Sequence, residues 1–432
     1  MTRIASVTRI AAFVCLGVLF LLHPAAVRAG GLYLTEWGQP SMGASGAGAA
    51  ALVEDASVAF TNPAGIVKLD EPQMMVTGMT ILSSAKFDQA PGTDVLAAGG
   101  AGPGSNGGDA GGLAFGGSFF YARPVSDRWG FGFAVTSLSG AVLDYEDSSN
   151  FVGRYWAEKS SLLTITVAPS VAYKISEKFS IAFSLPIALG VLDMDVAIAA
   201  PTPDGVEGLA EISEGKDIGV TGGVSFLWDV TDRSRLGLVY LGETEFDFEG
   251  DLDLTLPGGG VGVSDVDVNV EIPLAQTVRL SGTLEVSDRI TLLATLAWED
   301  WSTLDALPIS TSAGGGALTY DWEDTWRYAL GARIRGAGKW TWYTGAALDT
   351  DPTSASKRSL DLPVDQQIRL SAGATFNKSD RVTLGGAITI ADLGDAKIDN
   401  GGVRPVSGDP WAVEGEFDTN QAVFVAFNVN WK

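Results

Sequence analysis

The chain has 432 residues, 54 of them glycine, with a formal net charge of −24 and a mean hydropathy of +0.19. So acidic a chain is a poor partner for nucleic acid, because phosphate binding relies on lysine and arginine. The single cysteine, Cys15, and the single histidine, His23, both precede residue 30, and this limits the chemistry left to the rest of the chain.

Residues 1–29 are typical of a secretory signal peptide. Arg3 and Arg9 precede an apolar run from 10 to 22, and Val27-Arg28-Ala29 offers a cleavage site. The run is too short for a spanning helix, although a retained membrane anchor is the alternative. Cleavage would remove the only thiol and the only imidazole. Ser-His and Cys-His catalysis and the usual zinc sites are then excluded, and neither a metal nor a cofactor is expected.

Residues 30–72 differ from everything that follows them. They are rich in glycine and alanine, show no sustained alternation, and contain the sequence Asn62-Pro63-Ala64-Gly65. Pro63 lacks an N–H and biases Asn62 away from helix, and an ordinary turn is the alternative explanation. We interpret residues 30–72 as a hatch that folds back inside a barrel formed by residues 73–432.

Beyond residue 72 the chain alternates apolar and polar residues in long runs, as in 179–189, 266–286 and 423–431. Successive strand side chains point to opposite faces, so one face is apolar and the other wet. A soluble sandwich has the same period, but runs of more than ten residues suit tilted membrane strands. Aromatic residues at the run ends also favour a membrane. They are Trp129, Trp228, Trp340 and Trp431 near one set of turns, and Trp298, Trp301, Trp322 and Trp326 near one opposite loop.

Short polar turns and long loops follow one another regularly along the chain. Six short turns, such as Ser126-Asp127-Arg128, alternate with seven long loops. A propeller repeats at similar spacing but needs four short strands per blade. The pattern predicts an all-β fold, a 14-stranded antiparallel transmembrane β-barrel in a bacterial outer membrane, plugged by the hatch. The predicted loops are residues 85–110, 141–159, 191–214, 249–264, 303–317, 349–365 and 394–419.

Small residues line the inner face of the second and third predicted strands. Gly130 and Gly132 are among them. A lumen of this width needs a plug, and we expect these positions to leave room for the hatch. The alternative is that the glycines only adjust barrel curvature.

Several motifs occur in a fixed order along the chain: Asn62-Pro63-Ala64, then Trp326-Arg327-Tyr328-Ala329-Leu330-Gly331, then Asp351-Pro352, and finally Leu370-Ser371-Ala372-Gly373. With them the chain resembles, from the start to the end of the mature sequence, the FadL family of outer-membrane transporters of long-chain fatty acids and other hydrophobic compounds.

The resemblance implies a passive transport mechanism with no enzymatic step. Extracellular loops catch a hydrophobic ligand, an internal site holds it, the hatch shifts, and the ligand leaves sideways at a kinked third strand. Here that strand would be 129–140, and the gate would include Asn62, Pro63, Ala64, Gly130 and Gly132, with a wall gap beside 62–64. Lateral exit is physically sensible, because an apolar molecule then avoids water.

A ligand carboxylate would need a cation inside this acidic chain. Strand parity places Arg279, Arg327 and Arg369 inward and Arg154 near the mouth of the fourth strand, so these are the candidate substrate-binding residues. The alternative is that they pair with lumenal acids such as Glu271, Glu285 and Glu323. The basic residues that hold the carboxylate in fatty-acid transporters cannot be matched onto this chain.

The ligand therefore stays open between a long-chain fatty acid and a neutral aromatic hydrocarbon, and a plain porin or structural barrel is a further alternative. A carboxylate-only enzyme would need two lumenal acids in register. Outer-membrane lipid and lipopolysaccharide are the expected surroundings of a monomer. The alternating acids at Asp251, Asp253, Asp265 and Asp267 are typical of strands, whereas a calcium loop has tighter spacing.

Overall fold

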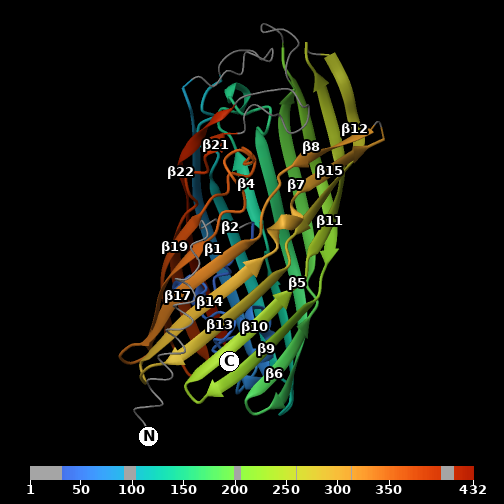
Figure 1. The fold of residues 1–432 in the computed structure, drawn as a ribbon. Helices are drawn as coiled ribbons and strands as arrows, with labels where there is room; N and C mark the ends of the chain where they lie inside the picture. Colours follow the sequence, from blue (N-terminus) through green and yellow to red (C-terminus); the bar gives the residue numbers. More distant parts are fainter. Residues whose placement is uncertain (1–31, 92–103, 199–205, 259, 313, 400–412) are drawn as a thin grey trace.

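The structure is a computed structural model that describes residues 32–91, 104–198, 206–258, 260–312, 314–399 and 413–432. It is an all-β barrel of fourteen long strands, several of which are interrupted (Figure 1). In chain order they are β1 (Gln73–Gln89), β2 (Leu113–Pro124), β3 with β4 (Trp129–Thr136, Gly140–Asp144), β5 (Lys159–Ser176), β6 with β7 (Phe179–Ser184, Ile187–Ile198), β8 with β9 (Gly208–Val220, Gly223–Thr231), β10 with β11 (Ser234–Leu241, Thr244–Leu256), β12 with β13 (Gly260–Leu274, Thr277–Glu285), β14 (Ile290–Glu299), β17 (Thr325–Arg335), β18 (Trp340–Asp349), β19 (Gln367–Asn377), β20 (Val382–Asp392) and β22 (Glu414–Trp431).

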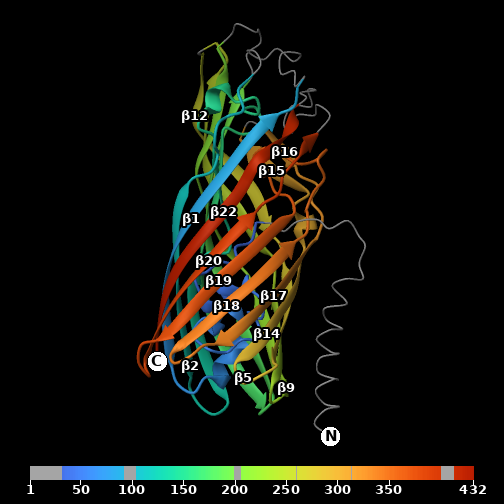
Figure 2. The ribbon, with the colours of Figure 1, turned by 90° about the vertical axis from the view of Figure 1, so that its left-hand side faces the viewer.

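The barrel closes through its first and last strands. Every pairing is antiparallel between neighbours, and β1 pairs with β22 along almost its whole length, with Met74 opposite Trp431 (Figure 2). The prediction of a 14-stranded antiparallel barrel is confirmed. The predicted export signal, 1–29, lies outside the described residues. Smaller elements complete the fold: β15 (Ala306–Thr311), β16 (Gly314–Thr319), β21 (Ile398–Asp399), η4 (Ser148–Asn150) and η5 (Trp301–Thr303).

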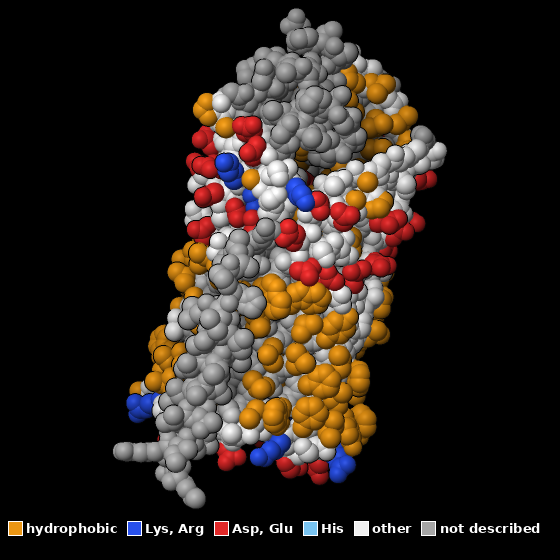
Figure 3. Space-filling model, viewed as in Figure 1, with side chains coloured by type: hydrophobic (Ala, Val, Ile, Leu, Met, Phe, Trp, Pro, Cys, Tyr) orange, Lys and Arg blue, Asp and Glu red, His pale blue; other side chains and the backbone are white. Residues whose placement is uncertain are grey.

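The lower part of the barrel carries the expected apolar outer face. In β6 and the last residues of β22 the large apolar residues point outward, as shown by the exposure of Phe183 and Phe427, while Ser180 and Asn428 are buried. Figure 3 shows apolar side chains over the lower half of one face and acidic ones above them. Trp129, Trp228 and Trp340 are exposed near the short turns, as an interfacial belt requires.

In two of the interrupted strands, the apolar side chains point outward on one side of the interruption and inward on the other. In β13 Val278 points outward, but in β12 Val268 and Val270 are buried inside. Phe246 and Phe248 of β11 are likewise buried. The prediction that one apolar face runs through 266–286 towards lipid is therefore wrong for its upper half, where the apolar side chains line the barrel interior. The predicted loops 191–214 and 249–264 are mostly strand, because β7, β8, β11 and β12 continue well above the lower barrel (Figure 1).

The upper interior is an aromatic and aliphatic cluster. Trp301 and Trp322 are buried there, with ring centroids 5.7 Å apart, so the prediction that these two residues lie at a membrane interface is wrong. Leu304 follows the short helix η5 and packs into the same cluster with Phe246. An apolar run has the same period whether it faces lipid or a protein core, and the sequence did not distinguish the two.

Residues 32–72 precede β1 and carry three short helices, η1 (Pro40–Ala44), α2 (Val58–Thr61) and η2 (Pro63–Lys68). Most of this segment is buried, and its helices contact strands on opposite sides of the barrel: η1 packs on β18, β19 and β20, and η2 on β5 and β6. We call it the hatch segment. Among the described residues, no helix is long and apolar enough to cross a membrane.

Candidate functional site

The turn at Asn62 holds the hatch segment to the barrel wall. The Asn62 amide donates to Ala50 O at 2.6 Å and to Phe226 O of β9 at 3.0 Å, and its carbonyl oxygen accepts from Ala64 N at 3.0 Å. Pro63 begins η2. Ser180 of β6 donates to Ala64 O at 2.7 Å. Asn62 is thus an anchor that joins two parts of the hatch segment to the wall at β9.

Gly130 and Gly132 of β3 lie against the hatch segment. A Cβ added at Gly130 would lie 2.6 Å from Ile66, and one at Gly132 would lie 2.6 Å from Ile66 and 2.3 Å from Ser170 Oγ. The structure places these glycines where the hatch approaches the wall closely. Any substitution there would push on Ile66.

The wall is interrupted higher up, between β2 and β4. Ladder pairing between β2 and β3 begins only at Phe119, opposite Val135. Residues 113–118 pair with β1 on one side, and no described strand pairs with their other edge; β4 pairs with β5 alone. The contact of Asp144 N with Ala110 O at 3.1 Å closes the top of this interruption. The interruption lies between β2 and β4, whereas the Asn62 turn binds β9, so the gap expected beside 62–64 stays a prediction.

An apolar cavity of about 300 Å³ connects this interruption with the barrel interior. We call it the upper cavity. The side chains that line it at the interruption include Phe115, Val142 and Leu163, and the hatch segment contributes Leu34 and Trp37. The largest part of the lining is therefore hydrophobic, and one end of the cavity lies between unpaired strand edges.

A smaller cavity of about 50 Å³ adjoins the same segment and is lined by Phe60, Leu241 and Arg279. Tyr33, Leu34 and Trp37 line both cavities, so residues 33–37 lie between them.

Residues 33–37 are held by the interrupted strands themselves. Leu34 N donates to Leu138 O at 2.9 Å, and Trp37 Nε1 donates to Ser137 O at 3.0 Å. On the other side the Tyr33 hydroxyl donates to Ala275 O, at the break between β12 and β13. The start of the hatch segment therefore spans the barrel between two irregular points of its wall.

The four predicted arginines fall into two groups. Arg154, in the loop between β4 and β5, forms two hydrogen bonds of 2.8 Å with Glu207. Arg327 binds Asp349 at 2.8 Å, and Arg369 binds both Asp349 and Glu36. These three have acidic partners, although not the acids that the sequence suggested.

Arg279 is different. Its guanidinium lies 5.8 Å from the centroid of the Trp37 ring. Among the described residues it forms no ion pair, although the buried Glu299 interacts with it electrostatically. Because Arg279 lines the small cavity together with apolar side chains, it is a cation that a ligand carboxylate could pair with. The geometry therefore singles out one of the four predicted arginines.

Asp349 is the centre of a buried ionic cluster that joins the hatch segment to β17, β18 and β19. It lies at the end of β18 and is 3% exposed. Arg327 also donates to Ser45 O at 3.0 Å, and Arg369 also pairs with Glu36 at 3.3 Å. Sequence reasoning missed both acids. The positions of the inward arginines were the available signal, since a buried cation needs a partner.

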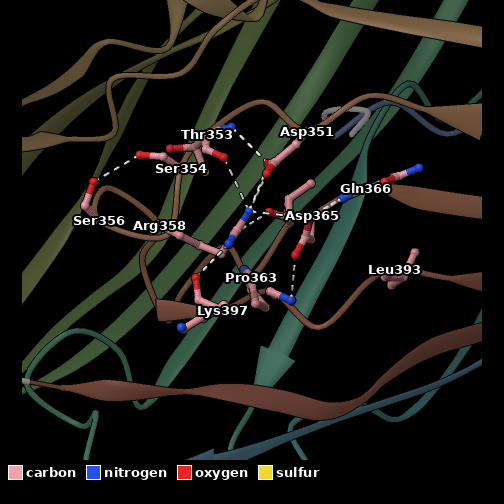
Figure 4. Close-up of polar contacts among 12 residues, drawn as sticks. Asp351, Thr353, Ser354, Ser356, Arg358, Pro363, Asp365, Gln366, Leu393 and Lys397 are labelled. Atoms are coloured by element: carbon pink, nitrogen blue, oxygen red, sulfur yellow. Dashed lines mark hydrogen bonds and ion pairs between the residues drawn. The ribbon is translucent and has the colours of Figure 1, made fainter. Parts of the chain in front are cut away.

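The loop between β18 and β19 covers the upper cavity from outside. Arg358 is its centre: it donates to both carboxylate oxygens of Asp351 at 2.9 Å, to Val364 O at 2.7 Å and to Lys397 O at 2.6 Å (Figure 4). The loop brings Asp361 to the cavity lining, where Tyr320 donates a hydrogen bond to it. Burial raises the pKa of the Asp361 carboxyl above its usual range, although hydrogen bonds from Ser359 and Tyr320 act in the opposite direction.

Below the hatch segment lies a polar basin of about 480 Å³ at the short-turn end of the barrel. We call it the lower basin. Its lining includes Glu54, which pairs with Arg333 and accepts a hydrogen bond of 2.7 Å from Tyr343, and Lys68, which pairs with Asp229 at 2.7 Å. Its walls are charged where those of the upper cavity are apolar.

Comparison with known proteins agrees with this architecture. The long-chain fatty acid transport protein of Escherichia coli K12 is 24% identical over 397 residues, covering 82% of this chain and 86% of that protein. Outer membrane protein P1 of Haemophilus influenzae Rd is 23% identical over 396 residues, covering 84% and 85%.

Solved structures share the fold. A Pseudomonas aeruginosa FadL homologue has a TM-score of 0.83 at 19% identity, covering 93% of this chain and 99% of that one. The Pseudomonas putida toluene transporter TodX has a TM-score of 0.67 at 14% identity, covering 94% and 99%. The model of the family described as outer membrane protein transport protein (OMPP1/FadL/TodX) matches residues 21–432. The chain belongs to this family of outer-membrane proteins, as its resemblance to FadL indicated.

Proposed function

We propose that this protein is a passive transporter that takes up long-chain fatty acids, or closely related hydrophobic acids, across the outer membrane. The observation that carries the proposal is the upper cavity, which is lined mainly by apolar side chains and ends at the unpaired edges of β2 and β4. A molecule in this cavity lies beside the membrane interior without having crossed the lower basin.

The exit route follows from the chemistry of the two compartments. Transfer of an apolar chain from an apolar site into water costs about 25 cal/mol per Å² of surface. The lower basin is lined by charged groups such as Glu54, Lys68 and Arg333, so entering it would carry that cost. Leaving between Phe115 and Val142 would keep the ligand in contact with hydrocarbon throughout.

The hatch segment is the proposed gate. Residues 33–37 separate the small cavity, with Arg279, from the upper cavity, with the wall interruption. A shift of these residues would join the two cavities. The turn Asn62, Pro63 and Ala64 and the contacts at Gly130 and Gly132 would keep the rest of the segment in place during that shift.

Arg279 favours an acidic ligand over a neutral one. Arg279 is half-buried and forms no ion pair among the described residues, although Glu299 interacts with it electrostatically. A ligand carboxylate would supply a direct partner for the guanidinium. The relatives with 24% identity are fatty acid transport proteins, which agrees with this choice. The toluene transporter among the similar structures makes uptake of neutral aromatic hydrocarbons the second candidate function.

A test uses a Gram-negative strain that lacks its own long-chain fatty acid transporter. Expression of the full chain should restore uptake of labelled oleate, and Arg279→Gln should reduce oleate uptake more than toluene uptake. Equal loss of both would show that Arg279 does not select the ligand by its charge, and would count against an acidic ligand. An ohmic open pore in planar bilayers without saturable ligand binding would contradict the proposal and indicate a porin.

A further inference from the structure

The carboxylate of Glu36 already occupies a position that a ligand carboxylate could take. Glu36 is 2% exposed and lines the upper cavity together with Arg369. Its Oε1 lies 3.3 Å from Arg369 Nε, and its Oε2 accepts from Thr35 N at 3.1 Å. Arg369 is thus the wall residue that Glu36 pairs with, and the other contact belongs to its own neighbour.

We propose that Glu36 is an internal competitor for ligand carboxylates at Arg369, and that its displacement by a hydrophobic acid releases the start of the hatch segment. The proposal rests on the proposed function and extends it, because it makes the ligand's charge a condition for opening. It also assigns a specificity role to Glu36, which is separate from the binding role suggested for Arg279.

Charge balance is the physical reason. Arg369 is 6% exposed, and removing one partner from a buried ion pair is strongly destabilising. A carboxylate ligand that replaces Glu36 leaves Arg369 with the same number of anionic partners, since Asp349 stays bound. A neutral hydrocarbon that displaces Glu36 would leave Arg369 with one anionic partner fewer. Displacement by a neutral hydrocarbon is therefore unfavourable.

Displacement of Glu36 would act directly on the proposed gate. Glu36 lies two residues after Leu34, whose N–H binds Leu138 O at the wall interruption, and one residue before Trp37, whose indole binds Ser137 O. Both neighbours lie between the small and the upper cavity. Loss of the Glu36–Arg369 pair therefore weakens the part of the hatch segment that separates the small cavity from the upper cavity.

The chain offers a matched control in Glu54. It too belongs to the hatch segment and pairs with a wall arginine, Arg333 of β17, but it lines the lower basin. Glu54→Gln removes a hatch-to-wall ion pair as Glu36→Gln does, without touching the upper cavity. A purely structural role for both acids would make the two variants behave alike.

The experiment measures equilibrium binding of labelled oleate and of oleyl alcohol to the full-length protein in detergent. We expect Glu36→Gln to bind oleate about tenfold more tightly, equivalent to 1.4 kcal/mol, because the competitor loses its charge. Binding of oleyl alcohol should not change, and Glu54→Gln should match the wild type for both probes. Glu36→Asp, which keeps the charge on a shorter side chain, should fall between the two and serves if the glutamine variant does not fold.

Unchanged or weaker oleate binding in Glu36→Gln would overturn the inference. An equal gain for both probes, or an equal gain in Glu54→Gln, would also overturn it, because that result indicates a loosened hatch without competition. Failure of the proposed function looks different: the wild type itself would then bind neither probe saturably.

Discussion

The upper cavity and the lower basin lie on opposite sides of the same hatch segment and differ in almost every respect. The upper cavity is the smaller, at about 300 Å³ against about 480 Å³. Its walls are mainly hydrophobic and it reaches unpaired strand edges, whereas the basin is lined by charged groups near the short turns. The difference supports the proposed lateral route, because an apolar ligand would lose contact with apolar surroundings if it entered the charged basin.

Blocking the wall interruption should have the largest effect. Gly116 of β2 lines the upper cavity, and a Cβ there would meet only the tip of Met79, at 3.3 Å. We expect Gly116→Phe to fold and to reduce oleate uptake about tenfold to a hundredfold, equivalent to about 1.4–2.8 kcal/mol, because its ring would fill the cavity at the wall interruption. Gly78→Phe, where nothing lies within 4 Å of the added Cβ, is the control. Normal uptake by Gly116→Phe would argue against lateral exit.

The ionic contacts on the two sides of the hatch segment should also differ in strength. Asp349 is buried between two arginines, so Asp349→Ala should lower the free energy of unfolding in detergent by about 3–5 kcal/mol. Asp229 pairs with Lys68 and Arg235 at the rim of the basin and is partly exposed. Its alanine variant should lose about 0–1 kcal/mol. Denaturant titrations of both variants measure these losses. Equal losses of unfolding free energy would show that the two ionic contacts do not differ in strength.

The Asn62 turn fastens the middle of the hatch segment to the wall at β9. Asn62→Ala removes the bonds to Ala50 and Phe226 and leaves their buried carbonyl groups without this donor, which costs about 1–3 kcal/mol. We expect a hatch segment that opens more often, seen as brief conductance steps in planar bilayers. Asn62→Asp, which keeps the acceptor for Ala64 N, should show the same steps. If neither variant shows conductance steps, the bonds of Asn62 are not what keeps the hatch segment closed.

The smallest effect concerns pH and is confined to the outer side. Because burial raises the pKa of Asp361, the folded state is penalised as pH rises through the unfolded pKa, and the penalty is complete above the folded pKa. Asp361→Asn should therefore be more stable than the wild type at pH 8, and this advantage should shrink as the pH falls. Thermal unfolding of both proteins from pH 8 to pH 4 measures this difference in stability. A difference that does not change with pH would show that titration of Asp361 does not cause it.

The sequence predicted the barrel and its strand number, but not how far β7, β8, β11 and β12 extend or how the site is built. Alternation and the rhythm of turns predicted the barrel, because a period of two has one structural meaning in Phe179–Ser184. It could not tell that Val268 and Trp301 face the interior, since core and lipid select the same residues. Strand alternation predicted that the arginines point inward, but their partners depend on how the hatch segment packs inside the barrel. No local sequence pattern predicts the ion pair of Glu36 with Arg369.

The most direct test of the central claim is to map where a bound fatty acid lies. Oleate with a photoreactive group at the end of its chain would be cross-linked to the folded protein, and the labelled peptides identified by mass spectrometry. Lateral exit predicts labels at the wall interruption, around Phe115 and Val142. Labels in the lower basin, around Asp55 and Thr341, would show that the ligand passes along the barrel axis and would contradict the account.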